Sequence, residues 1–497
     1  MKLQVKDMEI ETGGPLVATI NKNDAEKMDL HPLDRAKIIK GKKIETVVLN
    51  ISETGAIVPE GKIGLCEEVM NSLKLKVGDH IRLVPTKKPL SLEYIKKKLD
   101  GFRLSKKEID QIVWDIVHNK LSDIELTYFV AACYSHELDI RETTLLTKAM
   151  SRFGDILRIK RYPILDKHCV GGVCGNRTTM LIVPIVAACG VTIPKTSSRS
   201  ITSPAGTADT MEVLANVSFS IKKMKKIVER TNACIVWGGA LNLAPADDKI
   251  IRVERPLAID AKSQLLASVM AKKASVSATH LLVDIPAGKG SKIGSMKKAL
   301  SLKKDFEDLA KNLGIKIKVI ITDGREPIGN GIGPALEARD VLWTLRNDKM
   351  TPLDLKRKSL MMAGLMLEMA GKAAKGGGYY LAKKTLESGK AYKKMVEIIK
   401  MQEGKIIKPE NIPLGQLSWD VRAKKTGIIK EINNITIARI ARVAGAPQDK
   451  GAGIYLYKHI GDKVKKGEKV FTIYAYHKSK LDYAKELFRK LDGVCIG

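Results

Sequence analysis

Two loops rich in glycine and hydroxyl side chains stand close together in one stretch of the sequence. The first loop places Lys167 and His168 just before the dipeptide Gly171-Gly172. The second loop offers hydroxyl groups and one cation, on Thr196, Ser197, Ser198, Arg199, Ser200, Thr202, Ser203 and Thr207. Glycine lets backbone N–H groups approach a ligand closely, and clustered hydroxyls and cations bind anionic oxygens. Because the loops flank one apolar run, Met180–Cys189, the pattern predicts a phosphate-binding site beside a buried helix.

Turns, nucleotide loops and metal sites can share parts of this pattern. Gly- and Ser-rich loops are often simple turns, but two such loops that carry Lys167 and Arg199 favour anion binding. A P-loop is not predicted, because 171–178 lacks the Gly-Lys-Ser/Thr ending and 287–292 lacks the first glycine. His168, Cys169 and Cys174 fit no zinc spacing and lack an evident fourth ligand. We therefore expect neither a metal nor another cofactor.

Length and composition point to a multidomain globular protein of the cytoplasm. The chain has 497 residues, of which 44% are hydrophobic, and this length suits about two to four domains. No run reaches the ~18 apolar residues of a membrane span, and the N-terminal residues show no apolar signal region. The seven cysteines are scattered without a CxxC pair, which is typical of a reducing compartment.

The net charge is +31, from 86 basic minus 55 acidic residues, and it raises the hypothesis of RNA binding. Aromatic residues make up only 5% of the chain, so few stacking platforms exist for single-stranded nucleic acid. The lysines are also spread along the whole chain, as in the run 96–98. Solvated helix faces explain the charge better, and they would also attract an anionic substrate.

The N-terminal part predicts a β-rich module followed by helices. Residues 1–86 alternate turns with short β-rich runs, at 36–39, 45–51, 56–58 and 80–84, as in a small barrel-like module. From residue 90 the pattern changes to helical spacing. Ser105 with Glu108, and Ser122 with Glu125, each form the pattern of a capping box at a helix start.

From about residue 165 the pattern alternates strands and amphipathic helices, with candidate strands at 233–237, 280–285 and 315–321. Such alternation predicts a sheet covered by helices. A second β-rich stretch begins at Gly427 and predicts an α+β lobe that closes the chain. The predicted fold class is therefore α/β and multidomain: a β-rich barrel-like module, an α-helical domain, a large mixed-sheet α/β domain and a C-terminal α+β lobe.

Residues 90–497 resemble the thymidine and pyrimidine-nucleoside phosphorylases. The motifs that carry the resemblance are Lys167-His-Cys-Val-Gly-Gly172, Pro184–Gly190, Ser197-Ser-Arg199, Gly206-Thr-Ala-Asp209, Leu243–Asp247, Ser268–Lys273, Thr322-Asp323 and Ser388-Gly-Lys390. The N-terminal module, residues 194–203 and residues 252–260 are more similar to the archaeal AMP phosphorylases. Two positions depart from the nucleoside enzymes, since Cys169 stands for their serine and Ser198 for their glycine.

The resemblance implies a pentosyltransferase of nucleotide salvage or degradation. Enzymes of this kind cleave AMP with inorganic phosphate to the free base and ribose 1,5-bisphosphate. It also implies the domain limits: 1–86 for the N-terminal module, 90–160 plus about 243–273 for the helical domain, 165–240 plus 276–420 for the phosphate-binding α/β domain, and 421–497 for the lobe. The related enzymes are dimers, so we expect a homodimer or a higher homo-oligomer in which the N-terminal module joins dimers.

The resemblance also implies the site residues. Together with the loop pattern, it places the AMP and phosphate contacts on Lys167, Gly172, Ser198, Arg199, Ser200, Ile201, Thr202, Ser203, Thr207, Ser268, Lys272 and Lys292. Ser268 and Lys272 are four residues apart, so one helix face presents both. The proton donor implied for the leaving base is Asp260, which could otherwise cap the helix that follows.

Several alternatives stay open at this point. The sequence does not distinguish among AMP, CMP and UMP as substrates. It also leaves open which loop holds the 5′-phosphate and which holds the attacking phosphate. Arg252 and Arg255 are both candidates for a base contact. A thymidine or uridine phosphorylase remains the nearest rival function, and an RNA-binding protein is a rival of another class. Anthranilate phosphoribosyltransferase has a similar fold, but we find no convincing acidic magnesium–pyrophosphate motif here.

Overall fold

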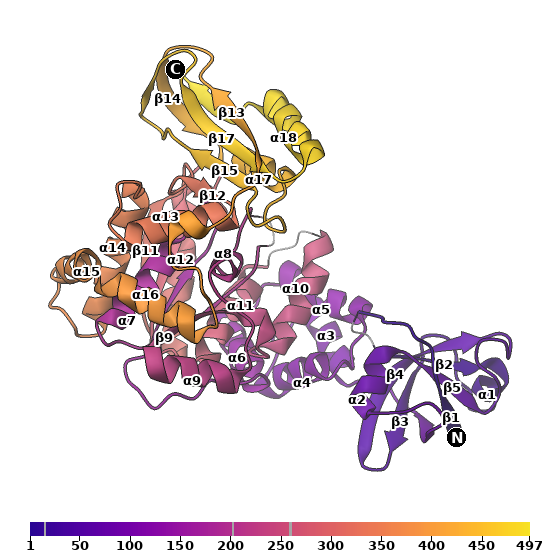
Figure 1. Cartoon of the computed structure of the whole chain (residues 1–497). Helices are drawn as coiled ribbons and strands as arrows, with labels where there is room; N and C mark the ends of the chain where they lie inside the picture. The colour runs from indigo at the N-terminus through magenta and orange to yellow at the C-terminus, as the bar shows by residue number, and fades with distance from the viewer. Residues whose placement is uncertain (14–15, 201–202, 258–260) are drawn as a thin grey trace. The chain divides into compact units, whose positions relative to one another are not determined.

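The computed structural model describes residues 1–13, 16–200, 203–257 and 261–497. These residues divide into two compact units. The first unit contains residues 1–153 and 244–268, and the second contains residues 154–243 and 269–497. Figure 1 shows both units and labels most of their helices and strands. The two segments of the second unit begin at residues 154 and 269. The predicted α/β ranges, 165–240 and 276–420, begin somewhat later in each case.

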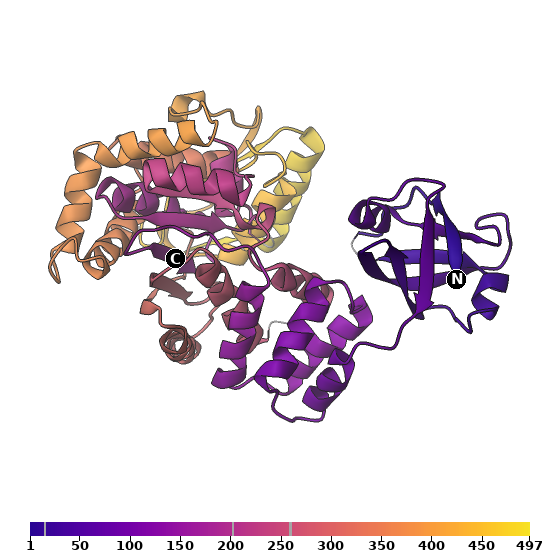
Figure 2. The same cartoon turned by 90° about the horizontal axis from the view of Figure 1, so that it is seen from below.

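The N-terminal module is a closed barrel (Figure 2). Its strand order is β1-β5-β2-β4-β3-β6. Its elements are β1 (Lys2–Asp7), β2 (Val17–Asn21), α1 (Lys22–Glu26), β3 (Arg35–Lys40), β4 (Lys43–Ser52), β5 (Lys62–Leu65), α2 (Glu67–Leu73) and β6 (His80–Pro85). Leu3 and Val5 of β1 are buried while Lys2 is exposed, because successive side chains of a strand face opposite sides. The predicted barrel-like module is confirmed.

One predicted strand of this module is wrong. The runs 36–39, 45–51 and 80–84 lie in β3, β4 and β6, but residues 56–58 form a turn. Gly55 precedes this turn and Pro59 follows it. Glycine and proline favour turns, and proline lacks the N–H that a strand ladder needs, so the short β-branched run between them does not extend.

Two distant segments of the chain form the helical bundle. Its helices are α3 (Ser91–Leu99), α4 (Lys106–Val117), α5 (Asp123–Ser135), α6 (Ile140–Arg152) and α10 (Pro245–Leu257), and α10 packs against α4 and α5. Both predicted capping boxes are present, at Ser105 with Glu108 and at Ser122 with Glu125. A third, at Asp139 with Glu142, starts α6. Each box supplies partners for backbone N–H groups that the first helical turn leaves unpaired.

The second unit is built around parallel strands whose carboxyl ends meet at one edge. Its strands are β7 (Leu165–Cys169), β8 (Ile193–Ser197), β9 (Ala233–Trp237), β10 (His280–Ala287) and β11 (Lys316–Asp323). β11, β10 and β7 form one parallel sheet, β8 and β9 form another, and a parallel bridge from Ile164 to Thr192 joins the two. The loops 170–177, 198–206 and 288–295 follow these strands, and ligands of open α/β sheets bind at this edge.

Helices cover these strands. They are α7 (Thr178–Ala188), α8 (Thr207–Glu212), α9 (Ile221–Thr231), α11 (Lys262–Ser275), α12 (Met296–Leu313), α13 (Pro334–Leu345), α14 (Leu353–Met369), α15 (Gly378–Glu387) and α16 (Lys390–Met401), with 3-10 turns at Gly238–Ala240 and Pro409–Asn411. Residues 178–187 of α7 are all buried, and the helix packs against α14 and α16. A helix that is apolar all round is a core helix, so the first glycine-rich loop, which leads directly into α7, rests on a rigid support.

The C-terminal lobe continues the second unit. It contains β13 (Leu417–Arg422), β14 (Gly427–Ile432), α17 (Asn434–Val443), β15 (Gly453–Leu456), β16 (Lys463–Val464), β17 (Lys469–Ala475), α18 (Lys478–Leu491) and β18 (Val494–Ile496). The strand β12 (Gly331–Ile332) precedes α13 but pairs with β15, in the sheet order β12-β15-β17-β13. The side chain of Asn434 accepts a hydrogen bond from Cys174 N, at 3.3 Å, and donates one to Gly324 O, at 3.1 Å. The lobe therefore supports the first glycine-rich loop directly.

The bundle contains a buried ion pair that we expect to be important for its stability. Both Lys98 of α3 and Glu142 of α6 have side chains only 3% exposed, and Lys98 Nζ lies 3.1 Å from both carboxylate oxygens. Lys98→Met leaves Glu142 buried without its cation, which costs about 3 to 5 kcal/mol. Scanning calorimetry should show that the first thermal unfolding transition of Lys98→Met has a clearly lower midpoint temperature than that of the wild type. The control is Lys96→Met on the exposed side of α3, and equal midpoints for the two variants would contradict the prediction.

Candidate functional site

β7 carries a buried cluster of lysines around one aspartate in its first half. Asp166 is fully buried, and its two carboxylate oxygens accept hydrogen bonds from Lys195 Nζ of β8, at 3.2 Å, and Lys273 Nζ of α11, at 2.7 Å. Lys195 Nζ also donates to the carbonyl oxygen of Lys167, at 2.7 Å. Lys167 is 1% exposed, and its Nζ donates to Thr178 Oγ1 at 3.1 Å. Residues from two strands and two helices thus fix the position of Lys167.

Three lysines, Lys167, Lys195 and Lys273, are buried here with two carboxylates, Asp166 and Asp284 of β10. Burial opposes the ionisation of Asp284, yet Lys167 holds its pKa below the usual value. Although burial disfavours its ionisation, Lys195 and Lys273 hold the pKa of Asp166 below its usual value. Burial lowers the pKa of Lys195 to about 7, and the neighbouring lysines act in the same direction against Asp166. Burial and the same lysines hold the pKa of His168 well below its usual value, so its imidazole is neutral. An excess of buried cations favours a bound anion.

The first loop approaches a third loop, 288–295, at backbone distance. Gly172 has φ +88°, and a Cβ on it would lie 2.1 Å from the backbone nitrogen of Lys292. Only glycine tolerates both the positive φ and this proximity. Gly172 and Lys292, two of the predicted contacts, therefore lie side by side beyond the ends of β7 and β10.

The second loop folds around one carboxylate of α8. Asp209 Oδ2 accepts hydrogen bonds from the backbone N–H groups of Ser200, at 2.7 Å, and Gly206, at 2.8 Å. Arg199 forms ion pairs with Asp209, at 3.2 Å, and with Glu212, at 2.5 Å. Its guanidinium carbon also lies 4.8 Å from the ring centre of Trp237. Arg199, a predicted anion contact, is thus engaged with two carboxylates, and its local role is to hold the loop on α8.

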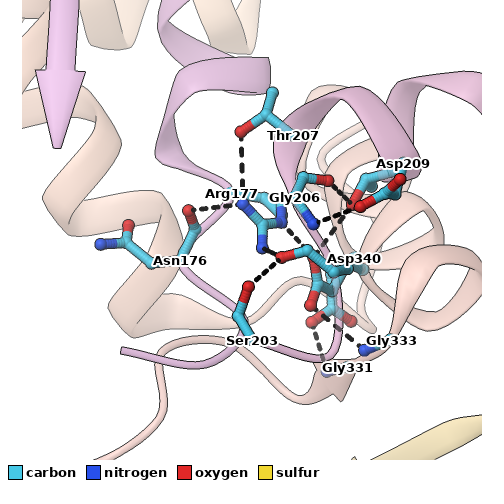
Figure 3. Close-up of polar contacts among 12 residues, drawn as sticks. Asn176, Arg177, Ser203, Gly206, Thr207, Asp209, Gly331, Gly333 and Asp340 are labelled. Carbon is cyan, nitrogen blue, oxygen red and sulfur yellow. Dashed lines mark hydrogen bonds and ion pairs between the residues drawn. The ribbon is translucent and has the colours of Figure 1, made fainter. Parts of the chain in front are cut away.

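Arg177 joins the two loops, and the sequence did not predict it. Its Nη2 donates to Ala205 O at 2.5 Å, and its Nη1 donates to Thr207 Oγ1 at 3.2 Å (Figure 3). The guanidinium also forms an ion pair with Glu337 of α13, whose side chain is fully buried. A lone arginine directly before an apolar helix is a signal that the sequence does contain. Its partner stands 160 residues away, which no local pattern reveals.

The other predicted residues are placed as follows. Ser198 to Ser200 and Ser203 lie in the second loop, Thr207 is the first residue of α8, and Ser268 and Lys272 both lie on α11. Ile201, Thr202 and Asp260 lie outside the described residues. Arg252 donates to Asp123 Oδ1 at 2.5 Å and to Gly13 O at 3.0 Å. Within the described ranges, no cluster of three or more His, Cys, Asp or Glu residues is arranged to bind a metal, and no helix is long and apolar enough to cross a membrane.

Comparison with known proteins decides the family. Three family models match in chain order: the glycosyl transferase family helical bundle domain over 92–154, its a/b domain over 161–392, and the pyrimidine nucleoside phosphorylase C-terminal domain over 428–491. The AMP phosphorylases of Pyrococcus furiosus and Thermococcus kodakarensis are each 48% identical, over 100% of this chain and 98% and 97% of theirs. The chain belongs to the AMP phosphorylase family. The AMP phosphorylase of Methanococcus vannielii is 42% identical over 99% of this chain and 97% of its own.

Solved structures bear on the fold alone. Anthranilate phosphoribosyltransferase from Thermus thermophilus is 19% identical with a TM-score of 0.53, and it covers 62% of this chain and 99% of its own. The enzyme of the same name from Saccharomyces cerevisiae is 16% identical with a TM-score of 0.51, over 64% of this chain and 99% of its own. The predicted resemblance and the predicted α/β multidomain class are both confirmed.

The contact between Gly172 and Lys292 has a matched control. Gly171→Ala and Gly172→Ala both place a side chain at positive φ, +96° and +88°, which costs about 1 to 2 kcal/mol. A Cβ on Gly171 meets nothing within 4 Å, whereas a Cβ on Gly172 meets the Lys292 backbone. Titration calorimetry with inorganic phosphate should show a dissociation constant raised about tenfold or more by Gly172→Ala, and far less by Gly171→Ala. Equal effects would contradict a site between these loops.

Proposed function

We propose that this chain is a pentosyltransferase that cleaves nucleoside 5′-monophosphates, AMP above all and also CMP and UMP, with inorganic phosphate. The products are the free base and ribose 1,5-bisphosphate. The observation that carries the proposal is the excess of buried lysine around Asp166, in the strand that leads into the first loop. The names of the relatives, which match over nearly their whole length, support the same substrate.

In the proposed reaction a phosphate oxygen forms a bond to C1′ of the ribose while the bond from C1′ to the base nitrogen breaks. The sugar carbon becomes electron-poor, and the electron pair of the broken bond leaves with the base. Lys167, fixed by Thr178 and by the Lys195 contact to its carbonyl, holds the phosphate dianion. Such preorganised charge supplies most of the rate enhancement. The reaction requires no covalent nucleophile.

The remaining proposed contacts follow the order of the loops. Gly172 and Lys292 offer backbone N–H groups and a cation. Within the second loop and at the start of α8, hydroxyls are offered by Ser198, Ser200, Thr202, Ser203 and Thr207, beside Arg199 and Ile201. Ser268 and Lys272 present one helix face to the base. Asp260 protonates a ring nitrogen of the leaving base, for which burial would have to raise its pKa.

A pyrimidine-nucleoside phosphorylase is the second candidate, because the C-terminal lobe matches the domain of that name. The two functions share the loops and the chemistry, and they differ in whether the 5′-phosphate of the substrate is required. The departures at Cys169 and Ser198 favour a pocket adapted to that extra phosphate. We also propose a cytoplasmic location, since all seven cysteines are free thiols.

The function predicts a strict requirement for phosphate. Chromatography should detect adenine released from AMP with phosphate or arsenate present, and none in a buffer that lacks both. Because the proposed contacts include no metal, treatment with EDTA should leave the rate unchanged. Release of adenine without phosphate, or a rate abolished by EDTA, would contradict the proposal.

The role of Asp260 predicts a change in turnover rather than in binding. Asp260→Asn keeps the size of the side chain and removes its titratable proton. Since general acid catalysis contributes about 10²- to 10⁴-fold, kcat on AMP should fall by about that factor while KM changes little. The control is Asp248→Asn, which alters an exposed carboxylate of α10. A near-normal kcat for Asp260→Asn would reduce the residue to a helix cap.

The role of the barrel predicts an effect on assembly. None of the proposed contacts lies in residues 1–86, so a chain that starts at residue 87 should still release adenine from AMP. If the barrel joins dimers of a homo-oligomer, the truncated chain should sediment as a smaller particle. An unchanged particle size would refute the assembly role.

A further inference from the structure

Arg177 holds together segments that are far apart in the sequence. It is the residue immediately before α7, and its side chain is only 10% exposed. Its guanidinium contacts Glu337 of α13 and the carbonyl oxygen of Ala205. It also donates to the hydroxyl of Thr207 (Figure 3). One buried cation therefore links the end of the first loop, the end of the second loop and α13.

Glu337 extends this link to the backbone around it. Its Oε2 also accepts a hydrogen bond from Thr210 Oγ1 of α8, at 3.0 Å, and its Oε1 accepts one from Gly333 N, at 3.1 Å. One helical turn later, Asp340 Oδ2 accepts from the backbone N–H groups of Asn330, at 2.7 Å, and Gly331, at 2.6 Å. The guanidinium thus contacts segments that are themselves held, so Arg177 cannot shift without disturbing both loops.

The contact with Thr207 has a consequence for hydrogen bonding. A hydroxyl group has one hydrogen to donate and two lone pairs to accept with. Arg177 has no acceptor, so in this contact Thr207 Oγ1 is the acceptor. The hydroxyl hydrogen then remains for another acceptor, and the positive guanidinium makes that hydrogen a better donor. Thr207 is only partly buried, which leaves it able to meet a ligand.

We propose that Arg177 is a positioning residue for the site: through Glu337 it fixes the second loop and turns the hydroxyl of Thr207 toward a phosphate group. The identity of that group rests on the proposed function, and two sources exist, the 5′-phosphate of AMP and inorganic phosphate. The competing role is that of an ion pair that only stabilises the fold. The two roles differ because a purely structural pair does not act through Thr207.

A double-mutant cycle tests this dependence. Arg177→Lys keeps a cation opposite Glu337 but loses the planar fork that reaches Ala205 and Thr207 together. Thr207→Val removes the hydroxyl and keeps the shape, and Thr207→Ser retains the hydroxyl. The double variant combines Arg177→Lys with Thr207→Val. Lys98→Met, in the buried pair of the other unit, controls for loss of stability alone.

The measurements are KM for AMP at saturating phosphate, KM for phosphate at saturating AMP, and calorimetric binding of inorganic phosphate without AMP. We expect Arg177→Lys to raise one of the two KM values about tenfold, the factor typical of one hydrogen bond, and to leave the other within about twofold. The KM that rises identifies which phosphate Thr207 contacts. Thr207→Ser should raise the same KM less than Thr207→Val does, and Arg177→Lys should add less than about twofold to the effect of Thr207→Val.

Three results would overturn the proposal. The first is that Arg177→Lys changes neither KM, or raises both KM values by the same factor. The second is that the effects of Arg177→Lys and Thr207→Val on KM multiply in the double variant, and the third is that Lys98→Met shifts KM as Arg177→Lys does. The binding of inorganic phosphate, measured by calorimetry, distinguishes a failure of the Arg177 proposal from a failure of the proposed function. If the wild-type chain binds phosphate but does not cleave AMP, the function is wrong, while the calorimetric cycle still decides the role of Arg177.

Discussion

The site depends on a charge imbalance buried in β7, the strand that leads into the first loop. Asp166 is bracketed by Lys195 and Lys273, and Lys167 is buried beside it with its ammonium bonded to the Thr178 hydroxyl. A buried cation without a full counter-charge is costly, and this cost shows in the pKa of Lys195, which burial lowers to about 7. We propose that a phosphate group bound beside this cluster relieves that cost, so that the charge imbalance favours phosphate binding.

The rest of the second unit fixes the loops that follow these strands. Glycine at 172 lets the first loop touch the backbone of Lys292. Asp209 accepts hydrogen bonds from the backbone N–H groups of Ser200 and Gly206, which fixes the shape of the second loop. Arg177 then ties the loops to each other and to α13. Polar groups in such a network hold their geometry before a ligand arrives, so little of the binding free energy is spent on ordering.

Local patterns predicted much of this arrangement. The strand at 233–237 agrees with β9, and Ser105 and Ser122 start helices as their capping boxes indicate. The strand prediction for residues 56–58 is wrong, because neighbouring Gly55 and Pro59 outweigh a short apolar run. The contacts of Arg177 with Glu337 and of Asp166 with Lys273 join residues more than 100 positions apart. Such pairs arise from the packing of whole elements, which spacing along the chain does not encode.

The central claim is that this charge and these loops select a substrate by its phosphate. The most direct test compares kcat/KM for AMP with kcat/KM for adenosine, at saturating inorganic phosphate. A charge-assisted hydrogen bond contributes about 1.5 to 3 kcal/mol, so losing two or three of them should favour AMP by about 10²- to 10⁴-fold. We predict a preference in that range. Equal kcat/KM values for AMP and adenosine would contradict selection by the 5′-phosphate and would favour the rival function, a nucleoside phosphorylase.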